Sequence, residues 1–215
     1  MLAVIVELHD RKEPFSKKMK IELEKYNPEW QNQFEKIKIE LMENISFLHP
    51  HIEHIGSTSI KGLSAKPIID ILIGLERSDL LDEAINPLLE QDYVYYPIFN
   101  ETMPYRRFFI KHKEKSNHLN IIKEEKDIPQ STEEHNLRLA HIHILTYNSE
   151  HWVRHIAFRN YLREHLSVQK EYQKLKENLS TKEWIDGNDY NKAKDSFIKT
   201  EEKTAIDWHN KTTNR

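Results

Sequence analysis

The run from residue 67 to residue 73 limits the folds that this chain can adopt. It reads Pro-Ile-Ile-Asp-Ile-Leu-Ile, so it is apolar apart from Asp70. A short apolar run rich in β-branched residues is typical of a central β-strand. A lone carboxylate in such a strand is costly unless it is paired, hydrogen-bonded or bound to a metal. The run therefore predicts an α/β or α+β protein in which Asp70 has a specific partner.

Other periodic segments place helices and further strands around this one. After Asn27-Pro28, apolar residues recur every three or four positions up to Leu48, which predicts an amphipathic helix. Pro97 cannot donate to a ladder, so the segment that holds it should lie at a sheet edge or break at that residue. Further strands are predicted at residues 21–26, 52–55, 93–99, 105–111 and 141–147. Further helices are predicted at residues 80–89, from the N-cap Ser149 onward, at 168–179 and at 190–208.

The segments fit one domain over residues 21–210. The length of the whole chain, 215 residues, suits a single core. We expect an N-terminal extension at residues 1–20 and a polar surface insertion at about 113–138. The sequence leaves open whether Met1 or Met19 is the native start.

Composition excludes several classes of function. No stretch approaches the roughly 18 apolar residues of a membrane span, and the N-terminus lacks the basic region of a signal peptide, so we expect a cytoplasmic protein without a membrane partner. The absence of cysteine excludes disulfides, thiolate metal sites and cysteine nucleophiles. The 32 basic and 35 acidic side chains give a net charge of −3, which argues against nucleic acid as a partner. The oligomeric state is left undetermined.

The segment from His54 to Asp70 carries the densest functional signal. It contains Gly56 and Gly62, two of the four glycines of the chain, which predicts a tight turn or a close approach of the backbone to a ligand. Gly56, Ser57 and Thr58 offer amides and hydroxyls that can cradle a phosphate. Lys66 either neutralises a phosphate or pairs with Asp70. Alternatively, Asp70 only satisfies the amides of this loop.

Motifs along the chain resemble those of a known family. They are Tyr26-Asn-Pro-Glu-Trp30, His54-Ile-Gly-Ser-Thr58, Gly62-Leu-Ser-Ala-Lys-Pro-Ile-Ile-Asp-Ile-Leu72, Arg106-Arg-Phe-Phe109, His141-Ile-His143, Phe158-Arg-Asn-Tyr-Leu-Arg163 and Tyr172-Gln-Lys-Leu-Lys176. In this order they resemble the GrpB family, also called UPF0157, of the nucleotidyltransferase superfamily. The resemblance covers about residues 20–200. It implies a nucleotidyltransferase-like mixed β-sheet flanked by helices, with a helical C-terminal part.

The resemblance also implies a chemistry at Asp70. The superfamily pattern is a Gly-Ser turn, then a strand with two carboxylates separated by one residue, then a third carboxylate on a later strand. Gly56, Ser57 and Asp70 match it, and such acids bind Mg²⁺ that holds nucleotide phosphates. The second acid is replaced by Leu72, which puts nucleotidyl transfer in doubt.

Histidines and one glutamate are further candidates near Asp70. His141 and His143 alternate with isoleucines, so both imidazoles should share one strand face, about where the third acid would lie. They bind metal or phosphate or act as a general base, or they simply occupy a solvated or hydrogen-bonded face. His54 is catalytic or is a buried structural histidine. Glu53 points to the face opposite His54 and is a weak substitute for the missing acid.

Four arginines are candidates for binding an anion. Arg106 and Arg107 must face opposite sides of their strand, so at most one enters a given site, and Arg107 is taken as the candidate. Arg159 and Arg163 are four residues apart on one helix face, which suits bidentate contacts to phosphate or carboxylate. Alternatively, they form salt bridges with acids such as Glu164.

Two functional hypotheses follow. The first is a Mg²⁺-dependent nucleotidyl transfer to an unknown small molecule, with Asp70, His141 and His143 as catalytic residues and Asp70 as the metal ligand. The second is a non-catalytic binding module for a nucleotide, a CoA precursor or another phosphorylated ligand. The CoA precursor is included because the family's domain shares a chain with dephospho-CoA kinase in some relatives.

Overall fold

The computed structural model describes residues 19–114, 120–129, 131–185 and 187–213, and its centre is a five-stranded mixed sheet. The strand order is β2-β3-β6-β5-β4. The bounds are β2 His51–Ile55, β3 Ile69–Leu75, β4 Val94–Tyr95, β5 Arg106–His112 and β6 Arg138–Thr146. β3 and β6 are parallel, whereas the other neighbours are antiparallel. The expected mixed sheet with flanking helices is therefore confirmed.

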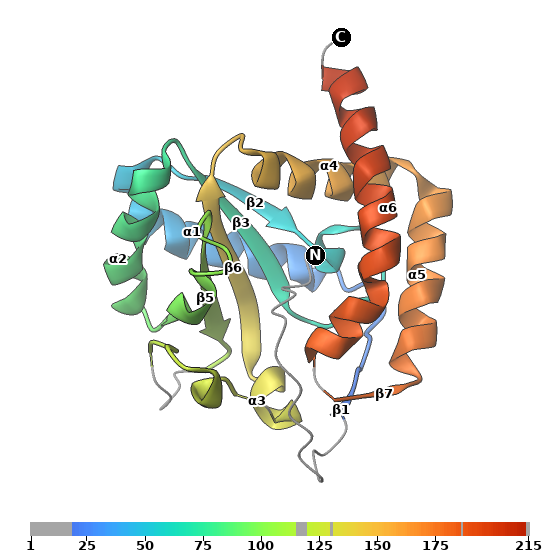
Figure 1. Cartoon of the computed structure of the whole chain (residues 1–215), viewed down its shortest axis with the longest axis horizontal. Helices are drawn as coiled ribbons and strands as arrows, with labels where there is room; N and C mark the ends of the chain where they lie inside the picture. The colour runs from blue at the N-terminus through green and yellow to red at the C-terminus, as the bar shows by residue number, and fades with distance from the viewer. Residues whose placement is uncertain (1–18, 115–119, 130, 186, 214–215) are drawn as a thin grey trace.

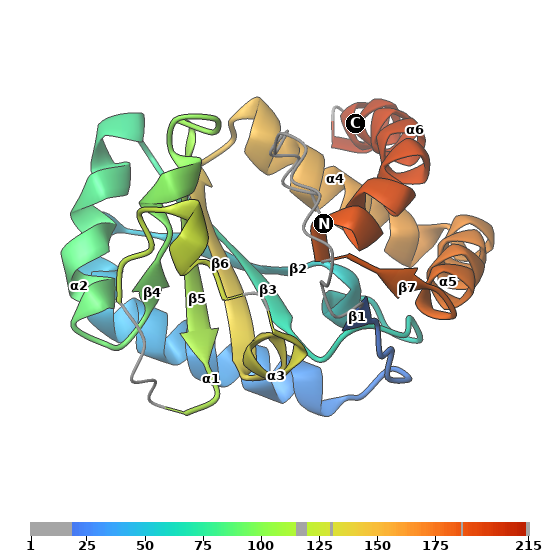
Figure 2. The same cartoon turned by 60° about the horizontal axis from the view of Figure 1, so that its bottom comes forward.

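Helices cover both faces of this sheet (Figures 1 and 2). One face packs against α1 (Glu29–Ile45) and α2 (Ile85–Leu89), which follows the 3₁₀ turn η3 (Ser78–Ala84). The other face packs against α4 (Glu150–Glu164), and α5 (Leu166–Ser180) and α6 (Gly187–Thr213) contact α4 in turn. The short elements are β1 Met19–Lys20, η1 Ser46–Leu48, η2 Ser57–Ser59, η4 Pro97–Phe99, η5 Glu125–Asp127, α3 Thr132–Asn136 and β7 Glu183–Trp184.

The first helix forms as its periodicity predicts. The side chain of Asn27 accepts a hydrogen bond of 3.0 Å from the amide of Glu29, which satisfies one of the free donors at the helix start. The apolar stripe is buried as a set and comprises Trp30, Phe34, Ile37, Leu41, Ile45 and, in η1, Leu48. This stripe packs on the sheet and forms the helical side of the main core.

Alternation along the central strands decides which side chains meet. Ile69, Ile71, Ile73 and Leu75 of β3 join the core under α1 and α2. Asp70 and Leu72 point to the opposite face, where α4 lies. That second face is the one on which the candidate site is built.

Two segments differ from the sequence-based expectation. Residues 21–26 form no strand; a single bridge joins Glu24 to Ala65, and the alternation arises because Ile21 packs against Leu179 and Tyr190. The insertion at 113–138 is not wholly at the surface, because Ile122 is buried and its amide donates to the carbonyl of Tyr95 over 2.8 Å. This contact covers β4, which is the predicted edge strand.

The predicted extension and the choice of start lie mostly outside the described residues. Residues 1–18 are not described, whereas Met19 and Lys20 form β1 and pair with β7.

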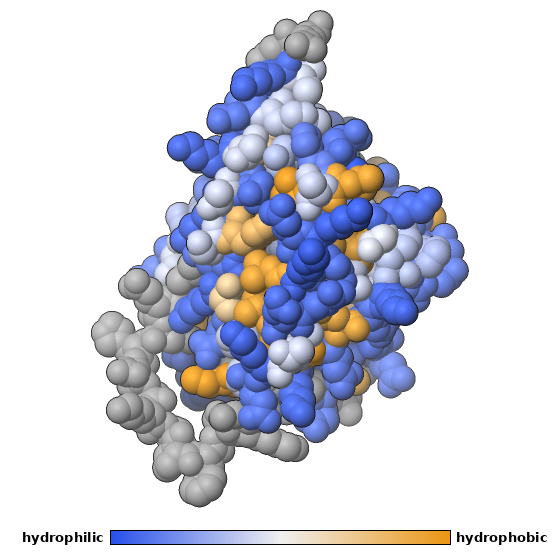
Figure 3. All heavy atoms as spheres, turned by 90° about the vertical axis from the view of Figure 1, so that its right-hand side faces the viewer, coloured by the Kyte–Doolittle hydropathy of each residue, from blue (hydrophilic) through white to orange (hydrophobic). Residues whose placement is uncertain are grey.

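The face that carries α5 and α6 is mainly hydrophilic, with apolar side chains exposed between hydrophilic ones (Figure 3). Among the residues that are described, no helix has the length and apolarity of a membrane span.

Candidate functional site

The turn after β2 brings the backbone against Asp70. Gly56 has φ +70° and ψ −175°, a region that side-chain-bearing residues avoid, and η2 begins directly after it. A Cβ atom at Gly56 would lie 2.2 Å from Oδ2 of Asp70. Asp70 is only 4% exposed. The glycine is therefore required both for the turn and for the close approach of this carboxylate.

The two predicted histidines share the face of Asp70, as strand alternation indicates. Nδ1 of His141 lies 3.3 Å from Oδ1 of Asp70, its neighbour in the parallel register. Nδ1 of His143 lies 3.3 Å from Nη1 of Arg106, which donates to it. Burial lowers the pKa of His141, against the pull of Asp70, and lowers that of His143 well below its usual value. Both imidazoles are therefore neutral near pH 7.

Three lysines and two tyrosines lie next to this face, and sequence reasoning found only Lys66 among them. Lys176 and Lys194 are each 2% exposed. The ammonium of Lys194 lies 4.2 Å, and that of Lys66 4.9 Å, from the ring centroid of Tyr190. Lys176 lies 4.9 Å from the ring of Tyr172 and donates to the carbonyl of Ser64. The available signal was the position of Lys176 in the buried stripe of α5, between Tyr172 and Leu179.

Burial makes these lysines unusually acidic. The pKa of Lys66 falls to about 8 and that of Lys176 to about 7, in both cases mainly because of desolvation. The pKa of Lys194 is lowered well below its usual value by burial and by the two neighbouring lysines. Asp70 opposes the shifts of Lys66 and Lys194, so the four groups form one electrostatic cluster. We call Asp70, Lys66, Lys176 and Lys194 the lysine cluster.

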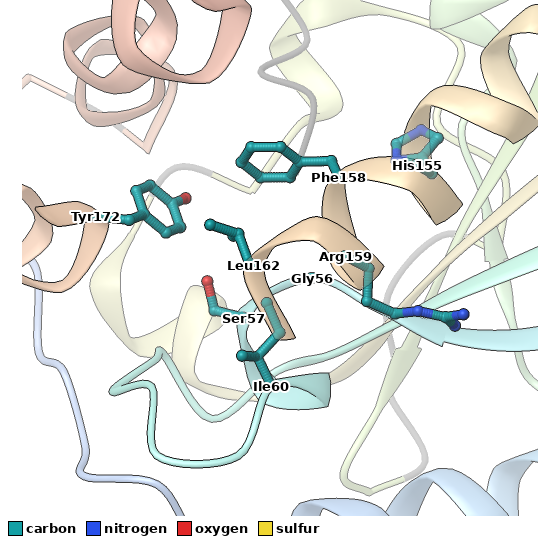
Figure 4. A pocket seen from close by; sticks show the side chains of 8 residues that line it. All are labelled: Gly56, Ser57, Ile60, His155, Phe158, Arg159, Leu162 and Tyr172. Carbon is teal, nitrogen blue, oxygen red and sulfur yellow. The ribbon is translucent and has the colours of Figure 1, made fainter. Parts of the chain in front are cut away.

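Two cavities lie near Asp70 and Lys66. A small one of about 10 Å³ lies between the Gly56–Ser57 turn, α4 and Tyr172, and no residue of the lysine cluster lines it. In it the oxygens of Ser57 and Tyr172 lie on the same side, while the guanidinium of Arg159 points away along β2 (Figure 4). A larger cavity of about 250 Å³ is lined by Lys66, Arg138 and His135, among others. The hydroxyl of Tyr190 is enclosed and has no hydrogen-bond partner within the described chain, and the hydroxyl of Tyr172 has only that of Ser57 beside it.

His54 and Thr58 lie on the other face of the sheet and serve the fold. The imidazole of His54 stacks on Phe34 at 4.7 Å, and its Nε2 lies 3.0 Å from Oγ1 of Thr58. Burial lowers the pKa of His54 to about 4. The Thr58 hydroxyl also donates to the carbonyl of Ile68. The structural reading of His54 therefore fits, and Thr58 does not face the lysine cluster.

Arg159 and Arg163 hold the turn through contacts with the chain itself. Arg159 donates to Glu53 over 2.6 Å, which is a salt bridge as in the second sequence alternative although with another acid, and to the carbonyl of His54 over 2.9 Å. Arg163 donates to the carbonyl of Ser59 over 2.8 Å. Both guanidinium groups thus position the turn, and their binding of a ligand stays a prediction.

The choice of Arg107 is corrected. Arg107 lies on the face of α1 and α2 and pairs with Asp82, which is exposed. Its neighbour Arg106 is 5% exposed and faces the side of Asp70 and His143. Strand parity predicts that the two arginines diverge, but it does not say which one turns toward α4.

The donor set around Asp70 does not fit Mg²⁺. This ion prefers six oxygen ligands in octahedral geometry. Leu72 occupies the second acidic position, and Glu53, directly across from it on β2, is bound by Arg159. Nowhere in the described ranges do three or more His, Asp or Glu side chains form a group that would hold a metal ion. Asp70 is therefore a lone carboxylate among cations, and no chemical step is assigned to a metal here.

Comparisons with known proteins agree on one family. The family model described as GrpB protein matches residues 20–204. The Glutamate-rich protein GrpB of Alkalihalophilus pseudofirmus is 32% identical over 80% of this chain and 88% of the relative. The UPF0157 protein YqkA of Bacillus subtilis is 31% identical over 89% of this chain but only 49% of its own length. The crystal structure of conserved protein GrpB from Enterococcus faecalis superimposes with a TM-score of 0.68 at 31% identity, over 87% of this chain and 99% of that one.

Proposed function

This chain belongs to the GrpB family, and we propose that it is a binding module for a phosphorylated small molecule, with nucleotides and CoA precursors as the first classes to test. The bound phosphate lies at the Gly56–Ser57 turn, beside the lysine cluster. A ligand of this kind belongs to the cytoplasm, so the expected location goes with the proposal.

The burial of Lys176, close to Lys66 and Asp70, carries the proposal. The side chain of Lys176 is 2% exposed, and burial lowers its pKa to about 7 because an enclosed ammonium group is costly. Burial also lowers the pKa of Lys66 to about 8, against the effect of Asp70, which is already 3.3 Å from His141. A phosphate brings up to two negative charges and several acceptor oxygens, so these two lysines support an anionic ligand.

Neutral donors complete the proposed phosphate site. The hydroxyl of Tyr190 is enclosed and has no partner among the described residues, although a buried hydroxyl normally has an acceptor, and the hydroxyl of Tyr172 has only that of Ser57 beside it. The side chain of Ser57 adds a third hydroxyl on the same side of the small cavity as that of Tyr172 (Figure 4). Phosphate oxygens satisfy such donors without help from a metal. These hydroxyls support a metal-independent mode of binding.

The larger cavity supports a ligand that extends beyond its phosphate. It borders Lys66, Arg138 and His135, and its volume of about 250 Å³ is close to the lower end of ligand pockets. Lys66 belongs both to this cavity and to the lysine cluster. The phosphate is therefore placed at the cluster and the remainder of the small molecule in the cavity.

Calorimetric titration of the full chain tests the proposal. Inorganic phosphate, ATP, dephospho-CoA and 4′-phosphopantetheine are titrated with and without Mg²⁺ at pH 7. We expect one of these ligands to bind without Mg²⁺. Because phosphate favours the charged lysines, binding takes up protons, and affinity falls as the pH rises through the pKa values of about 7 and about 8 of Lys176 and Lys66. The proton uptake is measured as a dependence of the binding enthalpy on the ionisation enthalpy of the buffer.

A matched pair of variants locates the site. Lys176→Met should weaken binding by about tenfold or more, because a charge-assisted contact of about 1.5–3 kcal/mol is lost. Lys174→Met, on the exposed side of the same helix, should leave binding unchanged. Absence of binding by every ligand, or equal effects of both variants, refutes the proposal. Transfer of a nucleotide by the wild type that is lost in Asp70→Asn refutes the non-catalytic reading in favour of nucleotidyl transfer.

A further inference from the structure

Arg106 is a buried cation that the proposed phosphate site does not use. Its side chain is 5% exposed and stacks on Phe108, with its guanidinium carbon 5.0 Å from the ring centroid. Nη1 donates to His143. Nε and Nη2 are enclosed and find no partner anywhere in the part of the chain that is described.

The two unpaired atoms are the ones that bind oxyanions best. The N–H bonds of Nε and Nη2 point in parallel from one edge of the guanidinium, and this edge matches the two oxygens of a carboxylate or phosphate. Leaving such donors buried and unpaired destabilises the folded chain. The arrangement thus presents an intact bidentate donor edge at the centre of the fold.

Among the described residues, the groups that act on the pKa of Arg106 supply no counter-charge. Burial lowers its pKa to about 10, so it remains charged near pH 7, and only the hydroxyl of Tyr105 opposes this shift. The imidazoles next to it, His143 and His155, are neutral because their pKa values lie well below 6.5. Neither offers a negative charge.

A second arginine nearby repeats the pattern. Arg154 of α4 also leaves Nε and Nη2 enclosed and unpaired among the described residues. Both guanidinium groups act on His155, whose ring lies 6.1 Å from that of His143. Arg154 has Glu202 of α6 within electrostatic range, whereas Arg106 has no such acid. Arg106 is therefore the primary candidate and Arg154 a secondary one.

We propose that Arg106, with its unpaired Nε and Nη2, binds a second anionic group, a carboxylate or a phosphate. The site is separate from the lysine cluster. The guanidinium of Arg106 donates to His143, whereas Asp70 contacts His141, and two residues of strand span about 7 Å. The two sites are therefore neighbours along β6 with different donors. The second site stands whether or not the lysine cluster binds phosphate.

Nitrogen-15 NMR of the arginine side chains tests the proposal directly. The Nε–H resonance of Arg106 is assigned by its loss in Arg106→Gln, and inorganic phosphate and sodium acetate are titrated separately into the full chain. We expect a saturable shift of this resonance with one or both anions. Arg107 provides the internal control, because it lies on the other face and pairs with Asp82, so its resonance should not shift. A response to phosphate alone assigns a phosphate site, and a response to acetate as well assigns a general oxyanion site.

Three outcomes distinguish anion binding at Arg106 from binding at the lysine cluster and from an unspecific effect of the anion. Retention of the shift in Lys176→Met shows that it does not arise from the lysine cluster. Calorimetric titration of Arg106→Gln with the same anion should show that the affinity of this second site falls by about tenfold or more, because two charge-assisted hydrogen bonds are lost. If that variant does not fold, the wild-type titration still decides. No saturable shift of Arg106, or an equal shift of Arg107, overturns the proposal.

Discussion

Substitution of Gly56 tests whether the turn and Asp70 are built as one unit. Gly56→Ala places a Cβ 2.2 Å from Oδ2 of Asp70 and 2.9 Å from its Cβ, in a backbone region that is nearly restricted to glycine. The backbone strain costs about 1–3 kcal/mol. Displacement of Asp70 also disturbs its contact with His141, which adds about 1–2 kcal/mol. A loss of about 2–5 kcal/mol in the free energy of unfolding is therefore expected.

Gly62→Ala is the matched control. Gly62 also has a positive φ, of +85°, but nothing lies within 4 Å of the point that an alanine Cβ would occupy there. It should cost about 1–2 kcal/mol, the penalty of the left-handed backbone alone. Urea unfolding followed by circular dichroism measures both, and the thermal midpoint should fall by about 2–4 °C for each kcal/mol.

A third variant separates the contact from the backbone. In an Asp70→Ala background the two nearest carboxylate atoms are gone, so Gly56→Ala should cost less than in the wild type. If Gly56→Ala and Gly62→Ala are equally destabilising, or if the background makes no difference, then the close approach of Asp70 does not explain Gly56.

Three further predictions concern the surroundings of the turn. The pKa of His54 is about 4 in the folded chain and about 6.5 in the unfolded chain, so the unfolded state binds the proton more readily. The free energy of unfolding should therefore fall by roughly 3 kcal/mol as the pH drops from 6.5 to 4. In a pH series of urea titrations, His54→Gln should remove much of this pH dependence. Arg159→Gln should lower the free energy of unfolding by about 2–3 kcal/mol, because it removes the hydrogen bonds to Glu53 and to the His54 carbonyl. Arg107→Gln should lower it by less than about 1 kcal/mol, because its partner Asp82 is exposed. Equal losses in thermal unfolding would contradict these roles. Lys176→Met should raise the thermal midpoint of the ligand-free chain, because it replaces an enclosed ammonium group by an apolar side chain. A lower midpoint would argue that the burial of Lys176 does not destabilise the ligand-free chain.

Local pattern accounts for most elements of the fold. The stripe of α1, the cap of α4 at Ser149, where the side chain accepts from Trp152, and the edge position of β4 all follow from neighbouring residues. The strand predicted at residues 21–26 is absent for a physical reason. Burial against two helices produces the same alternation of apolar residues as burial in a sheet. Periodicity reports which side chains are buried and not what covers them.

The candidate site was less accessible to sequence reasoning. Alternation correctly put His141 and His143 on one face, since strand parity is a local property. The sequence did not predict that lysines of the helical C-terminal part lie near Asp70, because a lysine in a helix is normally exposed to solvent. The side of the sheet on which Arg106 lies depends on pairing with β6, a long-range contact that no short motif encodes.

The parallel pairing of β3 with β6 has a consequence for how the protein folds. Asp70 and His141 are 71 residues apart, whereas β2 and β3 are joined through a short connection and pair antiparallel. Closing the longer loop costs more chain entropy, and this entropy is lost before stabilising contacts can form. Topologies that are rich in such long-range contacts therefore fold slowly. We therefore expect β2 and β3 to associate early and β6 to dock late. The partner of Asp70 arrives among the last contacts, so the carboxylate passes through folding without it.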